Sequence, residues 1–218
     1  MFVKICGITS EEDALLAVAL GADAVGFVFA PSSRQIAPVK AGEIARRLPP
    51  EVLTVGVFRD ETPQRVVQTV NKAGLKAAQL HGRESVDTTA YVVEHVAHVF
   101  KAFPGGSAEL ERASSYPVDA ILIDATTPGS GQVFDWALAE NAPRDKRLIM
   151  AGGLHPGNVR EAIEKVHPWG VDVSTGVEKS PGRKDPRLVR AFISEAGAAR
   201  VPVDDAIEPL PYDWQEDD

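Results

Sequence analysis

The sequence has a single cysteine, few aromatic residues and no long uninterrupted apolar run. Cys6 by itself can form neither an internal disulfide nor a zinc site, so neither device is available to stabilise the fold. The longest nearly apolar stretch is residues 14–30, which contains Asp23 and ends before Pro31. This stretch is too short for a membrane helix of about 20 residues. The first residues turn polar by Thr9 and leave no room for a secretion signal. We therefore expect a cytoplasmic protein with no membrane partner.

The chain lacks a basic stripe, and its net charge of -8 comes mainly from its C-terminal end. Of its 31 acidic residues, seven lie in residues 201–218, which contain no lysine or arginine, whereas residues 1–200 hold the other 24 and all 23 basic residues. Phosphate neutralisation needs clustered Lys and Arg, so we expect no nucleic-acid partner. We interpret residues 201–218 as a partly disordered acidic extension, although Leu210, Tyr212 and Trp214 leave open that it docks on the folded body.

Short β-branched runs alternate with helical patterns eight times along residues 1–200. The expected strands are 2–6, 24–29, 53–58, 77–80, 98–103, 120–124, 147–151 and 170–174. The expected helices are 10–20, 39–47, 63–72, 85–95, 108–115, 136–140, 156–166 and 186–198. Strict alternation predicts a parallel sheet, and eight units favour a closed barrel over an open sheet. We predict an α/β fold: a single (β/α)8 TIM barrel over residues 1–200, followed by the acidic extension.

Capping and stop signals support several helix boundaries. Thr9 and Glu12 have the spacing of a capping box, and Gly21 would end the helix that they begin. Asp135 can cap the short helix of the sixth unit. Three prolines stand where a first helical turn tolerates a missing N–H: Pro63, Pro156 and Pro186.

In a (β/α)8 barrel the chemistry lies at the carboxyl ends of the strands. Glycine-containing loops follow the seventh and eighth strands, with Gly152 and Gly153 in the first and Ser174, Thr175 and Gly176 in the second. Glycine lets backbone N–H groups approach an anion closely, and barrels often bind a phosphate at this place. Either loop alone could be a simple tight turn, but the two together predict a small phosphorylated substrate.

Cys6 ends the first expected strand and Asp124 ends the sixth. A free cysteine on a strand is often a small buried hydrophobe, but the turn at Gly7 into a helix places this sulfur at the rim. A thiol can serve as a base if a helix N-terminus or a substrate dipole favours the thiolate. Asp124 can cap a loop amide or, if poorly solvated, act as a general acid. The two groups would face each other across the mouth of the barrel.

Three further polar residues have two interpretations each. Arg34 lies on a polar loop after the second strand, where a solvated surface arginine is the common case and a fork for a substrate carboxylate is the functional one. His81 could orient the substrate or simply hydrogen-bond within its loop. Asp172 reaches the site only if it lies on the inner face of the eighth strand.

Seven motifs carry a family resemblance. In chain order they are KICGIT at 4–9, GADAVGFVF at 21–29, VGVF at 55–58, QLHG at 79–82, GQVFDW at 131–136, AGGL at 151–154 and GVDVSTGVE at 170–178. With these motifs the chain resembles the phosphoribosylanthranilate isomerases of tryptophan biosynthesis, from residue 4 to Asp185.

The resemblance implies an Amadori rearrangement without cofactor or metal. N-(5'-phosphoribosyl)anthranilate would become 1-(2-carboxyphenylamino)-1-deoxyribulose 5-phosphate, an aldose–ketose isomerisation. Cys6 corresponds to the general base at ribose C2′ and Asp124 to the general acid at the ring oxygen. Arg34 corresponds to the residue that holds the anthranilate, and the loops at 152–153 and 174–176 to the phosphate cradle. We count His81 and Asp172 among the substrate-binding residues.

Two other functions compete with this one. The histidine-pathway isomerase and its dual-substrate form resemble the chain in fold and chemistry, but they use an aspartate at the position of Cys6 and contain two similar half-barrels. The segment 58–62 after the third strand is not a glycine loop, so we find no such repeat. The second competitor is a non-catalytic phosphosugar-binding or redox-sensing barrel with Cys6 as the sensor. We expect a monomer and leave a dimer open.

Overall fold

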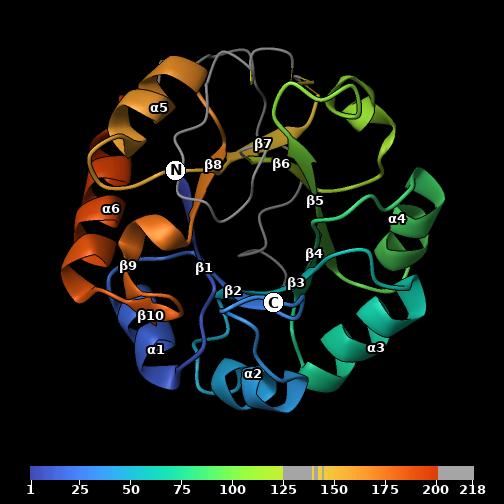
Figure 1. The fold of residues 1–218 in the computed structure, drawn as a ribbon, viewed down its shortest axis with the longest axis horizontal. Coiled ribbons are helices and arrows are strands. Elements are labelled where there is room, and N and C mark those ends of the chain that lie inside the picture. The colour runs from blue at the N-terminus through green and yellow to red at the C-terminus, as the bar shows by residue number, and fades with distance from the viewer. Residues whose placement is uncertain (125–138, 140–141, 144, 201–218) are drawn as a thin grey trace.

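The computed structural model of the chain describes residues 1–124, 139, 142–143 and 145–200. Eight parallel strands close into a barrel in chain order, and the eighth returns to pair with the first. Helices ring the barrel on the outside (Figure 1). The predicted (β/α)8 barrel is therefore confirmed. Within the described ranges no helix is long and apolar enough to cross a membrane.

The barrel strands are β1 (Phe2–Cys6), β2 (Ala24–Val28), β3 (Leu53–Phe58), β4 (Ala77–Leu80), β5 (His98–Pro104), β6 (Ala120–Asp124), β7 (Arg147–Met150) and β8 (Gly170–Val173). The outer helices are α1 (Glu11–Ala19), α2 (Pro38–Ala45), α3 (Pro63–Ala73), α4 (Val86–Val93), α5 (Val159–Val166) and α6 (Pro186–Ala198). The described residues also form the 3-10 helices η1 (Leu110–Ser115) and η3 (Thr175–Val177). A small hairpin joins β9 (Glu178–Ser180) to β10 (Arg183–Lys184).

The strand predictions agree with the structure to within one residue, whereas the helix predictions differ more. The expected helix at 108–115 is the shorter 3-10 helix η1, and Pro156 does not begin α5, which starts at Val159. The β9–β10 hairpin was not predicted at all. The expected helix at 136–140, apart from Ala139, its cap Asp135 and the extension 201–218 lie outside the described residues.

Helix α1 shows how tertiary contacts shift a local signal. Its N-cap is Ser10, whose side chain accepts a hydrogen bond from the N–H of Asp13 at 3.2 Å. The predicted capping box at Thr9 is wrong, because the Thr9 hydroxyl donates instead to the carbonyl of Gly182 in the β9–β10 turn. Gly21 follows α1 with a left-handed φ of 100°, which confirms the predicted stop.

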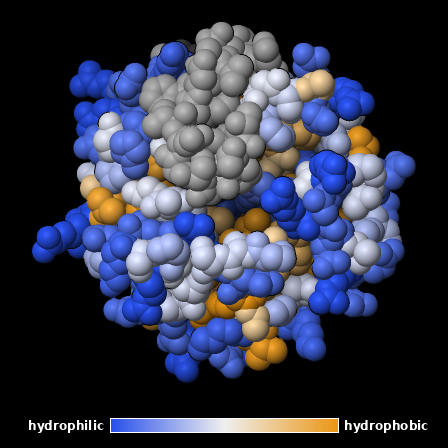
Figure 2. All heavy atoms as spheres, viewed as in Figure 1, coloured by the Kyte–Doolittle hydropathy of each residue, from blue (hydrophilic) through white to orange (hydrophobic). Residues whose placement is uncertain are grey.

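The strands bury two separate layers because their side chains alternate between the two faces. Strand and helix residues together form the outer core, which includes Ile5, Val25 and Phe27. The inner core contains strand residues almost alone, for example Phe2, Phe100 and Leu122. Seen from the same side, the outer surface is mostly hydrophilic with small scattered hydrophobic patches (Figure 2).

The side chains that face the barrel interior become polar toward the carboxyl ends of the strands. On β1 the inner positions run from Phe2 through Lys4 to Cys6, and on β8 from Gly170 through Asp172 to Ser174. The bottom of the barrel is therefore an apolar plug, and its top is a layer of charged and polar groups. That layer is the floor of the candidate site.

Candidate active site

The thiol of Cys6 lies at the end of β1 beside a buried ion pair. Lys4 donates a hydrogen bond to Asp172 across the β1–β8 pairing, with 2.8 Å between Nζ and Oδ1, and the ammonium is fully buried. A Cβ on Gly26 would lie 2.8 Å from the Cys6 sulfur and 3.2 Å from the Lys4 nitrogen. Glycine at this position on β2 therefore makes the space in which the thiol and the ammonium meet. Asp172 lies on the inner face of β8, which answers the question that the sequence left open.

Burial raises the pKa of the Cys6 thiol above its usual value. The ammonium groups of Lys4 and Lys184 lower that pKa, and the carboxylate of Asp172 raises it. The effect of burial is the largest, so the pKa of the thiol is raised overall. Burial alone would lower the pKa of Lys4, but Asp172 outweighs it and keeps the ammonium charged. The sequence suggested a rim thiol, whereas the structure gives a thiol with 7% exposure that is neutral near pH 7 before a substrate binds.

Asp124 lies at the end of β6 and meets the histidine that follows β4. The His81 Nε2 is 3.1 Å from Asp124 Oδ2, and the His81 Nδ1 is 2.9 Å from the side-chain nitrogen of Gln79. With Gln79 donating to Nδ1, the ring carries its proton on Nε2, and this nitrogen faces Oδ2 of Asp124. His81 thus holds the orientation of the proposed acid, and its contact is with Asp124 rather than only with its own loop.

A pocket opens between the carboxyl ends of β6, β7 and β8. Gly152 and Gly153 adopt left-handed φ values of 79° and 67°, and a Cβ on Gly176 would overlap the carbonyl oxygen of Leu154. The Ser174 hydroxyl is buried and finds no hydrogen-bond partner within the described ranges. Seven of the residues named from sequence line this pocket: Asp124, Gly152, Gly153, Asp172, Ser174, Thr175 and Gly176.

Arg34 reaches into the mouth from the loop after β2. Its Nε and Nη2 each donate to the Glu178 carboxylate at 2.8 Å, and Nη2 also donates to the Thr175 hydroxyl at 3.2 Å. The side chain is 14% exposed, so the interpretation as a solvated surface arginine is wrong. A Cβ on Gly7 would collide with both Arg34 and Ser174, which shows how closely the arginine approaches the end of β1.

The β9–β10 hairpin supplies two charged groups that the sequence analysis missed. Glu178 on β9 receives Arg34, and Lys184 on β10 donates to Glu178 Oε1 at 3.0 Å and to the Ser174 carbonyl at 3.1 Å. Burial would raise the pKa of Glu178, but the hydrogen bond from Arg34 and the charge of Lys184 lower it on balance. Burial lowers the pKa of Lys184, and Glu178 opposes that effect. The proline–glycine pair in KSPGRK signals this turn, but strands of three and two residues are too short for a periodicity to indicate.

Lys4 and Gln79 were also missed, although a signal for each was present. Each is a polar residue in an otherwise apolar strand, at a position that faces the barrel interior. Each also stands two residues before a polar group at the mouth. Lys4 precedes Cys6 in this way, and Gln79 precedes His81. A buried polar residue needs a partner, so the alternation alone could have placed both beside the site.

Contacts or a shared pocket link nine of the ten residues named from sequence, and the tenth, Cys6, joins them through Lys4 and the end of β1. Strand order explains this, because β8 and β7 are the two strands between β1 and β6. A thiol, a carboxyl group and glycine loops thus surround one mouth. The fold and the site define a class: (β/α)8 barrel enzymes that act on a small phosphorylated substrate.

Comparisons with known proteins agree with that class and narrow it. The family model described as N-(5'phosphoribosyl)anthranilate (PRA) isomerase matches residues 3–195. An N-(5'-phosphoribosyl)anthranilate isomerase of Desulforudis audaxviator is 53% identical over 204 residues, covering 90% of this chain and 98% of its own.

Solved structures show the same similarity. The phosphoribosyl anthranilate isomerase of Thermus thermophilus superposes with a TM-score of 0.86 at 42% identity, over 92% of this chain and all of the other. A second isomerase structure, solved in complex with reduced 1-(o-carboxyphenylamino)-1-deoxyribulose 5-phosphate, has a TM-score of 0.79 at 43% identity over 90% of this chain and 98% of the other. The chain belongs to the N-(5'-phosphoribosyl)anthranilate isomerase family.

Proposed function

We propose that the chain converts N-(5'-phosphoribosyl)anthranilate to 1-(2-carboxyphenylamino)-1-deoxyribulose 5-phosphate, with Cys6 as base and Asp124 as acid. The reaction is the aldose–ketose isomerisation of its family. One observation carries the proposal for the residues: the ends of β1 and β6 bring a lone thiol and a carboxyl group to the mouth that the two glycine loops border.

The acid step falls to Asp124. A protonated carboxyl group donates its proton to the furanose ring oxygen while the bond from C1′ to that oxygen breaks. The anthranilate nitrogen supplies the electron pair, which leaves an open chain with a protonated Schiff base at C1′. Because the His81 ring lies against Asp124 Oδ2, the carboxyl group cannot rotate freely away from the substrate.

The base step falls to Cys6. The cationic Schiff base that the first step creates favours the thiolate, which offsets the effect of burial on the thiol pKa. The thiolate removes the proton from C2′, and the electron pair of that C–H bond forms the C1′=C2′ double bond. The π electrons of the C1′=N bond move to the nitrogen and neutralise its charge. The resulting enolamine becomes the ketone when C1′ gains a proton and the 2′-hydroxyl loses one.

Two anchors would hold the substrate across the mouth. The loops at Gly152–Gly153 and Ser174–Gly176 offer backbone N–H groups and a buried hydroxyl to the phosphate. Arg34 uses Nε and Nη2 on Glu178, and Nη1 has no partner among the described residues. We assign that nitrogen to the anthranilate carboxylate, which a guanidinium binds well.

Turnover of phosphoribosylanthranilate by the purified chain tests the proposal, followed through the loss of substrate fluorescence. We expect Cys6→Ala and Asp124→Asn each to lower kcat by about 10²–10⁴-fold, as acid–base groups typically contribute. Near-normal kcat in either variant would remove that residue from its role. A parallel assay with the histidine-pathway aminoaldose should show no turnover, because Cys6 stands where that enzyme has an aspartate.

We also propose that the chain acts as a monomer. The large hydrophobic residues exposed in the described part are Met1 before β1, Leu15 on α1 and Val39 on α2, so no single element presents more than one of them as a dimer surface. Light scattering after size-exclusion chromatography measures the mass directly. A mass twice that of the chain would overturn this proposal and leave the chemistry untouched.

A further inference from the structure

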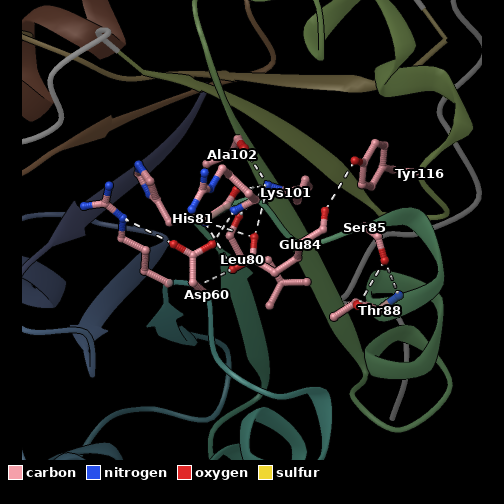
Figure 3. Close-up of polar contacts among 12 residues, drawn as sticks. Asp60, Leu80, His81, Glu84, Ser85, Thr88, Lys101, Ala102 and Tyr116 are labelled. Atoms are coloured by element: carbon pink, nitrogen blue, oxygen red, sulfur yellow. Dashed lines mark hydrogen bonds and ion pairs between the residues drawn. The ribbon is translucent and has the colours of Figure 1, made fainter.

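Another buried ion pair lies under the loop that follows β4, next to the site but outside the chemistry assigned above. Lys101 on β5 is 2% exposed, Glu84 in the loop is 6% exposed, and Lys101 Nζ lies 3.2 Å from Glu84 Oε2. Figure 3 shows both side chains with the backbone groups that they contact. Burying two charges costs free energy that their attraction often does not repay, so stability alone is a weak reason for this pair.

The ammonium of Lys101 holds the backbone on both sides of His81. Its Nζ donates to the carbonyl of Gly82 at 2.8 Å and lies 3.5 Å from the carbonyl of Leu80, the residue before His81. It also donates to the carbonyl of Ala102 on its own strand at 2.9 Å. Four acceptors, three carbonyls and the Glu84 carboxylate, therefore surround the three N–H groups of the ammonium. These contacts restrict the rotation of the Lys101 side chain.

The carboxylate of Glu84 holds the same loop from the other side. It accepts hydrogen bonds from the N–H of Gly82, at 2.9 and 3.1 Å, and from the N–H of Asp60 in the loop after β3, at 2.9 Å. Asp60 in turn accepts from the N–H of Arg83 at 2.7 Å. A side chain at position 82 would overlap the Asp60 backbone, so only glycine permits this close arrangement.

His81 thus lies in a backbone segment that several hydrogen bonds hold in place. Its own N–H donates to the Phe58 carbonyl at 2.8 Å, and the carbonyls before and after it point toward Lys101. The fixed backbone presents the imidazole to Asp124, where 3.1 Å separates Nε2 from Oδ2. The contact from Gln79 fixes only the rotation of the ring, because it touches Nδ1 and no backbone atom of the loop.

We propose that Lys101 and Glu84 are positioning residues that hold the His81 imidazole against the Asp124 carboxyl group. Neither touches the substrate, and both act through the loop that carries His81. The inference rests on the proposed role of Asp124 as the acid. Displacement of the ring by a fraction of an ångström would leave the carboxyl group free to turn away from the ring oxygen of the sugar.

A double-mutant cycle between Lys101 and His81 tests the proposal. Lys101→Met alone should lower kcat at least about tenfold, while KM changes little, because the groups that anchor the substrate are on other loops. In a His81→Ala background the same substitution should lower kcat less than about twofold, because the ring that it positions is gone. An equal loss of kcat in both backgrounds, or no loss in either, would overturn the proposal.

A matched control separates positioning from stability. Asp119 accepts a hydrogen bond from the N–H of Val99 at 2.7 Å, at the end of β5 that lies away from the mouth. Asp119→Ala should lower the Tm yet leave kcat unchanged, and a kcat loss equal to that of Lys101→Met would assign the effect to β5 stability. If Lys101→Met does not fold, Lys101→Met combined with Glu84→Gln removes both charges, keeps an acceptor for the loop N–H groups and should show the same coupling to His81.

A readout that needs no turnover distinguishes failure of this inference from failure of the proposed function. The ¹⁵N chemical shifts of the His81 ring in the ligand-free protein report its contact with Asp124. They should move in Lys101→Met and stay in place in Asp119→Ala, and unchanged shifts in Lys101→Met would overturn the positioning role even if the wild-type chain is fully active. If the wild-type chain did not turn over phosphoribosylanthranilate, the proposed function itself would be wrong.

Discussion

Single residues at the mouth show how neighbours set the chemistry of a side chain. The Cys6 thiol lies between two ammonium groups and a carboxylate, and burial still keeps its pKa above the usual value. The raised pKa keeps the free thiol protonated near neutral pH, and a protonated thiol reacts far more slowly with oxidants and alkylating reagents than a thiolate does. This state argues against the redox-sensor alternative, because sensor cysteines carry a lowered pKa and are accessible.

The raised pKa of Cys6 predicts how activity depends on pH. Below its pKa the thiol holds its proton, so the fraction of competent base in the free enzyme grows as the pH rises toward that value. We expect kcat/KM to increase on the alkaline side of neutrality, and alkylation of this single cysteine by iodoacetamide to have a midpoint above the ordinary thiol value of about 8.5. A midpoint below that value would contradict the raised pKa of the Cys6 thiol.

Arg34 should affect binding more than chemistry. Arg34→Ala removes the proposed contact with the substrate carboxylate, which is present in both the bound substrate and the transition state. We expect KM to rise about tenfold or more while kcat falls far less, because a charge-assisted contact contributes about 1.5–3 kcal/mol. Steady-state kinetics give both constants. An unchanged KM would leave Arg34 with a structural role only, as the partner of Glu178.

At the scale of elements, the β9–β10 hairpin completes the mouth of the barrel. It carries Glu178 and Lys184 beneath the loop after β8, and two contacts tie it to the start of α1. Thr9 donates to the Gly182 carbonyl, and the Asp13 carboxylate accepts from the N–H of Lys184 at 3.2 Å. The first and the last units of the barrel are therefore joined beside the loop that follows β8.

The start of α1 offers a test of which residue caps it. Ser10→Ala removes the acceptor for the N–H of Asp13 and should lower the free energy of unfolding by about 1 kcal/mol. Glu12→Ala is the matched control, because the Thr9 capping box requires Glu12 and the Ser10 cap does not. In the structure the Glu12 side chain is exposed and lies 4.0 Å from Arg183, an ion pair that contributes little. Urea denaturation measures both variants. A larger loss of unfolding free energy in Glu12→Ala than in Ser10→Ala would support the Thr9 capping box instead.

At the scale of the whole molecule, the barrel closes before the acidic extension begins. Strand β8 pairs with β1, α6 ends at Ala198, and the family model ends at residue 195. We propose that residues 1–200 form the catalytic domain and that residues 201–218 are dispensable for folding and catalysis.

A chain that ends at Arg200 tests this division. We expect its kcat and KM to match those of the full chain and its Tm to lie within about 2 °C, since 1 kcal/mol shifts the Tm of a domain of this size by roughly 2–4 °C. Calorimetry and the turnover assay measure both. A fall in Tm of ten degrees or a large change in KM would instead show that the extension packs on the barrel, as Leu210, Tyr212 and Trp214 left open.

The sequence by itself determined the order and type of the barrel elements. Each strand and most helices bury one face, and the spacing of apolar residues along the sequence reveals that face. The sequence also predicted which loops border the mouth of the barrel, since the carboxyl ends of parallel strands must meet at one end. Only the tertiary structure decided the charges around that chemistry. Lys184 and Glu178 lie near Cys6 and Arg34 through closure of the barrel between its first and last units, and no local pattern records a contact between residues so far apart.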